Sequence, residues 1–304
     1  MGTSRMNAND WSKHIGATSS KRTEEIFTQK TLHDDLNPKN FTVRESCDSV
    51  ANLLSTPIIL ACDETGSMGI IAETLIRKGL GTVILELHER KPVPDPHVLI
   101  MGIGDCYSDK SPIQATQFES DMVLTKQLAS IYIEGNGGSN NGENYNLAWY
   151  FAATRTKTDN FLKRGKKGYL FTIGDEPPYD TLEKAHIQKF MGDGEEKDIS
   201  TRDLLTLVSK EWEVYHVMIE EGYYFRKNPD EVRARWRDLL GEAAISLSDH
   251  TKLAEVIVSA IQIHQGKPVA EVAKSWSGDT SLVVAKSLNS LTEKREEATG
   301  VVKL

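Results

Sequence analysis

A short polar segment, Asp63-Glu64-Thr65-Gly66-Ser67, carries the residue types best suited to chemistry in this sequence. It follows an apolar run and combines the carboxylate of Asp63 with the hydroxyls of Thr65 and Ser67. Hard cations such as Mg²⁺ prefer oxygen ligands of these kinds in octahedral geometry. The pattern therefore predicts a divalent-cation site, and the plainer alternative is a turn in which Ser67 caps the following helix.

Two further aspartates, Asp105 and Asp175, also follow apolar runs that read as strands. In an open α/β sheet, ligands bind beyond the carboxyl ends of the strands, so these are the positions at which binding residues are expected. A single aspartate at such a position is more often a cap. Three at the same edge would repel one another, and a bound cation would relieve that repulsion.

The elements that must position these residues are predicted from apolar patterning. Short apolar runs predict strands at residues 56–62, 98–103, 168–173, 213–219 and 244–247. Helical patterns are expected at 68–89, 121–131, 143–154, 200–210 and 252–263. Apolar strands that alternate with helices predict an α/β fold with a doubly wound, mostly parallel sheet flanked by helices and with N- and C-terminal extensions.

The segment D-E-T-G-S-M-G, residues 63–69, resembles the metal ion-dependent adhesion site (MIDAS) of von Willebrand factor A (vWA) domains of the intracellular type. Asp63, Thr65 and Ser67 match the first motif residue by residue, and Asp175 matches the aspartate after a later strand. Residues 137–143, G-G-S-N-N-G-E, resemble the loop before the middle helix. The resemblance implies a Rossmann-like vWA fold over about residues 55–265. It also implies Mg²⁺, or Mn²⁺ or Ca²⁺, at these four residues.

The sequence departs from the family pattern before the middle helix, where the family usually has a threonine. Glu143 falls near that place, with Ser139 a few residues upstream. A carboxylate there would add negative charge and tighten cation binding, so Glu143 and Ser139 are further candidate ligands. Asp105 and its neighbour Asp109 are candidates for the rim of the site. Asp105 would contact the side chains that bind the ion and would not bind the ion itself.

Two functions fit these residues. The resemblance implies a protein-interaction module that binds an acidic residue of a partner through the held cation, as a scaffold or adaptor in an intracellular complex, in some members beside an ATPase. The alternative is a metal-dependent hydrolase or phosphotransfer enzyme that uses the same carboxylates. The predicted loops contain no clear general base, nucleophile or phosphate-gripping Lys or Arg, which favours a binding module without catalytic residues.

Composition gives weaker constraints. The 304 residues carry 36 Lys and Arg against 44 Asp and Glu, a net charge of −8. That acidity disfavours nucleic acid and anionic membranes as partners. Three cysteines and a polar start without an apolar segment favour a cytoplasmic protein. Six of the eight histidines lack metal-ligand spacing and are interpreted as structural; they are His88, His97, His186, His216, His250 and His264.

Three regions are predicted: a polar N-terminal arm at residues 1–54, the vWA-like domain at 55–265 and a helical C-terminal extension at 266–304. The extension contains two short amphipathic segments, at 269–273 and 282–288. Because helices this short are marginal alone, their apolar faces should be buried. We expect them to pack back on the outer helices of the sheet, and docking to a partner or a second copy is the alternative.

Overall fold

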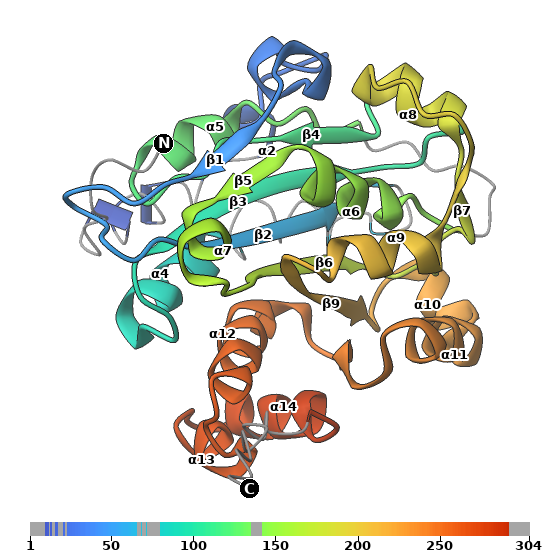
Figure 1. Cartoon of the computed structure of the whole chain (residues 1–304). Coiled ribbons are helices and arrows are strands. Elements are labelled where there is room, and N and C mark those ends of the chain that lie inside the picture. Colours follow the sequence, from blue (N-terminus) through green and yellow to red (C-terminus); the bar gives the residue numbers. More distant parts are fainter. Residues whose placement is uncertain are drawn as a thin grey trace, which may run out of the picture.

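The computed structural model describes residues 10–11, 13, 16–17, 21, 23–65, 68, 71, 80–134 and 142–291. Its centre is a six-stranded sheet in the order β10-β9-β6-β2-β3-β4 (Figure 1). All neighbouring pairs are parallel except β3 and β4. The strands are β2 (Thr56–Asp63), β3 (Pro96–Ile103), β4 (Ile113–Ala115), β6 (Gly168–Gly174), β9 (Trp212–Ile219) and β10 (Ala244–Leu247). The predicted α/β class with a mostly parallel sheet is confirmed, whereas the short β4 was not predicted.

Strand β2 is buried along its whole length. Side chains alternate between the two faces of a strand. Ile58, Leu60 and Cys62 accordingly belong to one hydrophobic core, and Ile59 and Ala61 belong to the other. A strand covered on both faces needs no polar alternation, which is why its sequence is a continuous apolar run.

Each of the two cores lies between one face of the sheet and the helices that pack on that face. Helices α4 (Leu80–Arg90), α5 (Val123–Ala129) and α12 (Leu253–His264) pack on the face of Leu60. Helices α6 (Tyr145–Thr154), α8 (Lys184–Met191), α9 (Thr201–Val208) and α11 (Pro229–Leu240) pack on the opposite face. Of the helix predicted at 68–89, the stretch 72–79 lies outside the described residues.

Short elements complete the chain. They are the helices α2 (Thr23–Ile26), α7 (Asp159–Arg164) and α10 (Tyr223–Lys227), the strands β1 (Arg44–Ser46), β5 (Thr156–Thr158), β7 (Thr181–Leu182) and β8 (Ile199–Ser200), and the 3-10 turns η1 (Asp34–Leu36), η2 (Pro38–Asn40), η4 (Gly241–Ala243) and η5 (His250–Lys252).

The strand order places a switch point at β2. The chain passes from β2 through α4 to β3 on one side of β2, whereas β6, β9 and β10 follow one another on its other side. At such a point the connections leave the sheet in opposite directions, and a crevice opens beyond the carboxyl ends of the strands. Asp63 and Asp175 lie at this crevice, at the ends of β2 and β6.

The segment before β2 packs on the rest of the molecule where it is described. Strand β1 pairs in parallel with β5, and Leu36 is buried in the same core as α4. Arg164 in α7 forms an ion pair with Asp48, with Nη1 and Oδ2 2.8 Å apart. The boundary at residue 54 stays a prediction.

The C-terminal helices α13 (Val269–Lys274) and α14 (Asp279–Leu288) pack back on α12, and α14 also contacts β10, as expected (Figure 1). The side chains Val272, Val284 and Leu288 are buried there. Leu282 was expected on the buried face, but its side chain is 70% exposed. Val284, two residues later, is buried instead, because the packed face of α14 is turned away from Leu282.

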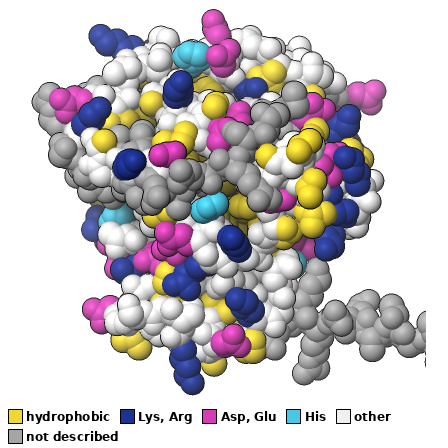
Figure 2. Space-filling view, turned by 90° about the vertical axis from the view of Figure 1, so that its left-hand side faces the viewer, with side chains coloured by type: hydrophobic (Ala, Val, Ile, Leu, Met, Phe, Trp, Pro, Cys, Tyr) yellow, Lys and Arg dark blue, Asp and Glu magenta, His cyan; other side chains and the backbone are white. Residues whose placement is uncertain are grey.

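Figure 2 shows the face of the molecule at the amino ends of the sheet, where acidic, basic and hydrophobic side chains are mixed. Within the described ranges, no helix combines the length and the apolar character needed to cross a lipid bilayer.

Candidate functional site

The candidate site lies at the carboxyl edge of the sheet, where β2 and β6 end beside the start of α6. Asp63 is the last residue of β2, and Asp175 follows the last residue of β6. Glu143 lies two residues before α6. All three side chains are buried, with Asp63 and Asp175 0% exposed and Glu143 3% exposed. Three of the carboxylates singled out in the sequence are therefore buried at one edge of the sheet.

Asp63 is held by hydrogen bonds on both of its oxygens. Oδ1 accepts from the Thr65 backbone N–H at 2.8 Å and from the Thr65 hydroxyl at 2.6 Å. Oδ2 accepts from the Tyr145 hydroxyl at 2.7 Å. These hydrogen bonds set the orientation of the Asp63 carboxylate and place the Thr65 hydroxyl oxygen beside it. Two ligands of one ion would need to lie close together in this way.

Tyr145 reaches Asp63 from within an aromatic cluster. Its ring lies 4.9 Å from that of His216 and 5.4 Å from that of Trp236, centroid to centroid. Gly174 leaves room for this contact, because a Cβ there would lie 1.9 Å from the Tyr145 hydroxyl oxygen. Tyr145 is not among the site residues predicted from the sequence, because its position in a buried helix gives no signal of this role.

Asp175 is positioned by the loop after β9. Its Oδ2 accepts a hydrogen bond from the Tyr224 backbone N–H at 2.8 Å. Gly222 packs against the same side chain, and a Cβ on that glycine would lie 2.2 Å from the Asp175 Cβ. The β9–α10 loop therefore determines where this carboxylate lies.

Glu143 is tied to the loop after β6 through its backbone. Its N–H donates to the Pro177 carbonyl at 3.0 Å, and its carbonyl accepts from the Tyr179 N–H at 3.3 Å. The side chain does not point into solvent, and its buried Oε1 has no hydrogen-bond partner among the described residues. An unpartnered oxygen in a buried carboxyl group is costly, and a water or an ion commonly satisfies such an atom.

The rim residues Asp105 and Asp109 lie in the loop after β3. Asp105 is 1% exposed and accepts hydrogen bonds from the Tyr107 N–H at 3.0 Å and the Ser108 hydroxyl at 3.0 Å. Asp109 Oδ2 accepts from the Asp105 N–H at 2.8 Å. Asp105 thus has partners within its own loop, while its charge still acts on Glu143.

The electrostatics of the site are unfavourable to ionised carboxyl groups. Burial and then the charge of Asp175 raise the pKa of Asp63 to about 7, against the hydrogen bonds from Thr65 and Tyr145. Burial and then the charge of Asp63 raise the pKa of Glu143 well above its ordinary value. The other charges that most affect Glu143 are also carboxylates, those of Glu176, Asp105 and Asp109. A bound cation would reverse this balance.

The donor set suits a hard cation, with one qualification on geometry. Asp63, Thr65, Glu143 and Asp175 offer only oxygens, and Ser67 and Ser139 lie outside the described residues. In the described ranges, one group of three side chains of metal-binding types has ligand atoms within 4.8 Å of one another. It consists of Glu221, Asp249 and His250. The carboxylates of Asp63, Glu143 and Asp175 do not meet that limit together, so an ion here would use hydroxyls and waters as well.

Comparisons with known proteins give no family. No protein-family model matches the chain, and no curated protein sequence is similar to it. Among solved structures, the pilus adhesin SpaC from Lactobacillus rhamnosus GG matches with a TM-score of 0.45 and 11% identity, over 71% of this chain and 30% of that one. Proximal thread matrix protein 1 from the mussel byssus matches with a TM-score of 0.45 and 9% identity, over 72% and 48%. The chain covers less than half of either protein.

Proposed function

We propose that this chain is a vWA-type protein-interaction module that holds a divalent cation, Mg²⁺ by preference, at the carboxyl edge of its sheet. Asp63, Thr65 and Ser67 would bind the ion. Asp175 and Glu143 would bind it directly or through water. Ser139 is a further candidate ligand, and Asp105 would act from the rim. The observation that carries the proposal is the buried Glu143 carboxyl group. In the described part of the chain its Oε1 has no partner, and the charge that most raises its pKa is that of Asp63.

A cation would turn a destabilising cluster into a favourable one. Buried carboxylates lose hydration and repel one another, and in a low-dielectric site both effects are large. Protonation could relieve them, but a divalent ion does so while leaving the carboxylates ionised. Mn²⁺ and Ca²⁺ would suit the same oxygen ligands and are expected to substitute.

The ion would supply an electrophilic position for a partner. Protein ligands from one side leave coordination positions occupied by water, and a carboxylate from a partner protein can replace one of them. The residues of this chain then orient the ion and exclude water from its inner side. We infer binding of an acidic residue of a protein partner, in a scaffold or adaptor role, rather than catalysis. In the described ranges, no Lys or Arg is among the main charges acting on Asp63 or Glu143, so none of these residues supplies a cation there to bind a phosphate.

Removal of the Asp63 carboxylate is expected to abolish both cation and partner binding. Calorimetry should show Mg²⁺ binding to the wild-type chain and none at this site in Asp63→Ala. Capture of partner proteins on the immobilised chain should be lost with EDTA and with the variant. Asp238→Ala, which removes an exposed carboxylate, is the matched control. Equal Mg²⁺ affinity in Asp63→Ala, or Mg²⁺-dependent turnover of phosphomonoesters lost in that variant, would contradict the proposal.

Tyr145→Phe is expected to weaken Mg²⁺ binding by about tenfold, as is common when a group that orients a metal ligand is removed. The hydroxyl donates to the ionised form of Asp63, so its loss should raise the pKa of Asp63 further. Calorimetry at pH 7 and pH 8.5 would show the weakening most clearly at the lower pH. Tyr150→Phe is the control on the same helix, because its hydroxyl bonds Glu195 at 2.7 Å. Equal losses in both variants would show a general effect on α6.

A further inference from the structure

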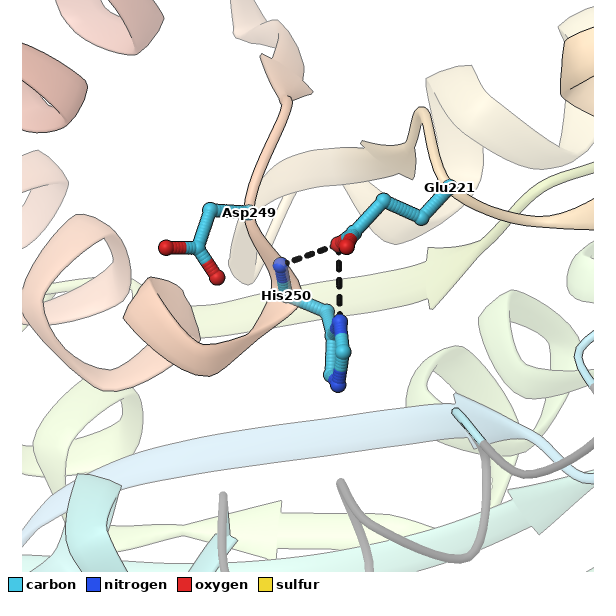
Figure 3. Close-up of side chains that lie close together, drawn as sticks. All are labelled: Glu221, Asp249 and His250. Carbon is cyan, nitrogen blue, oxygen red and sulfur yellow. Dashed lines mark hydrogen bonds and ion pairs between the residues drawn. The ribbon is translucent and has the colours of Figure 1, made fainter.

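A second group of ligand atoms converges at the same edge of the sheet, beyond the ends of β9 and β10. Glu221 follows β9, and Asp249 and His250 follow β10 (Figure 3). One potential ligand atom from each side chain lies within 4.8 Å of the other two. Ligands bind an ion at about 2.0–2.6 Å, so two on opposite sides of it are separated by about 4–5 Å. The spacing of the three side chains is therefore compatible with one shared ion.

The local hydrogen bonds hold these side chains and leave ligand positions open. Glu221 Oε2 accepts from the His250 backbone N–H at 2.6 Å and lies 2.7 Å from His250 Nδ1. Asp249 Oδ1 accepts from the Thr251 N–H and hydroxyl, at 3.0 and 2.6 Å. Within the described part of the chain, no hydrogen bond uses the second oxygen of either carboxylate. Each acid is thus oriented through one oxygen, with the other available.

The neighbouring basic side chains belong to other carboxylates. Arg233 Nη2 lies 2.7 Å from Glu220, and Lys252 Nζ lies 3.7 Å from Glu255. In the described ranges, the only basic group within ion-pair distance of Glu221 is His250, which is neutral when it acts as a metal ligand. Two carboxylates beside one imidazole leave net negative charge for a cation to balance. The His250 and Glu221 side chains are 19% and 38% exposed, so an ion can reach them.

We propose that Glu221, Asp249 and His250 form a second cation site, for a first-row transition ion of the Zn²⁺, Co²⁺ or Mn²⁺ class. An imidazole nitrogen combined with carboxylate oxygens suits these ions, whereas Mg²⁺ prefers oxygen ligands alone. Three protein ligands leave at least one position to water. The site differs in chemistry from the all-oxygen group at Asp63 and does not depend on it.

The site has a structural consequence for its neighbour. Glu221 precedes Gly222, which packs against the Asp175 side chain, and Tyr224 donates its N–H to Asp175. An ion that joins Glu221 to Asp249 and His250 would therefore tie the β9–α10 loop to the end of β10. This link would restrain the β9–α10 loop, which positions Asp175.

Co²⁺ is the probe, because its visible absorption reports the coordinating atoms. The full-length chain, freed of metals with EDTA and then saturated with Mg²⁺, should bind one Co²⁺ with an absorption spectrum that shows nitrogen and oxygen ligands. His250→Gln and Glu221→Gln should each weaken this binding by about tenfold or more. Asp63→Ala should retain it, which separates failure of this site from failure of the Mg²⁺ proposal.

His33→Gln is the matched control. His33 also lies near one acid, with Nδ1 3.9 Å from Asp35 Oδ2, but no third ligand group joins them among the described residues. This variant should therefore bind Co²⁺ as the wild type does. Circular dichroism verifies that each variant folds. If His250→Gln does not fold, His250→Asn is used in its place. Absence of Co²⁺ binding in the presence of Mg²⁺, or equal affinity in folded His250→Gln and wild type, would overturn the proposal.

Discussion

Ending the chain after Gln265 is expected to cause a large loss of stability. Helices α13 and α14 bury Val272, Val284 and Leu288 against α12 and the end of the sheet. Full burial of a Val or Leu side chain contributes about 1.5–3 kcal/mol, so three correspond to roughly 5–9 kcal/mol. Since total stability is typically about 5–15 kcal/mol, the truncated chain should lose a large share of its free energy of unfolding and its Tm should fall. Thermal unfolding followed by circular dichroism measures the effect.

Two single substitutions give a sharper form of this prediction. Leu288→Ala removes a fully buried side chain and should cost about 2–5 kcal/mol. At about 2–4 °C per kcal/mol, Tm should fall by roughly 4–20 °C. Leu282→Ala, on the same helix but 70% exposed, should change Tm by no more than about 1–2 °C. A stable truncated chain with altered oligomer size would instead show that the tail is a docking segment.

The second large effect concerns pH and the Asp63 carboxyl group. Its folded-state pKa is raised to about 7 from 3.8, so the folded state binds this proton more tightly than the unfolded state does. The associated stability is present below about pH 4 and is lost as pH rises through about 7. The pKa of Glu143 is also raised in the folded state, so its contribution to stability is likewise lost as pH rises. For Asp63, roughly three pKa units at about 1.4 kcal/mol per unit correspond to a loss of about 4 kcal/mol over this interval in the metal-free protein.

Mg²⁺ and Asp63→Asn should each remove that penalty. The gain in Tm on adding Mg²⁺ should be small at pH 5 and rise toward pH 8, because the ion binds ionised carboxylates. Asp63→Asn keeps the shape of the side chain without its charge. Its metal-free Tm at pH 8 should exceed that of wild type and should not respond to Mg²⁺. Asp238→Asn, at an exposed carboxylate, should follow wild type. A Mg²⁺ effect independent of pH would contradict this account.

Much of the fold could be predicted from local patterns in the sequence. The apolar run at residues 56–62 indicated a strand buried on both faces, and β2 is buried throughout. Ser200 was placed at the start of a helix, and its hydroxyl accepts from the Asp203 N–H at 3.1 Å. Such features depend on residues close together in the chain. The face of a short helix that packs is less certain, which is why Leu282 was misplaced.

The candidate site was predictable only in part. Aspartates after strands meet at one edge because parallel strands end there, and Asp63 and Asp175 follow that rule. Tyr145 was missed because it contacts Asp63 across 82 residues of sequence. His250 was interpreted as structural because no ligand spacing surrounds it. Glu221 comes beside it through the parallel pairing of β9 and β10, in which Leu247 is level with Ile219.

The sequence by itself determined the apolar strands, the helices between them and the oxygen-rich segment at Asp63, because each depends on neighbouring residues. The tertiary structure decided which carboxylates are buried together. It placed Glu143 close enough to Asp63 for the Asp63 charge to raise the Glu143 pKa, with Glu143 Oε1 unpartnered among the described residues. It also put Glu221 against His250. Strand order, register and the path of each loop set these contacts. They arise from the packing of the whole core, which no local pattern encodes.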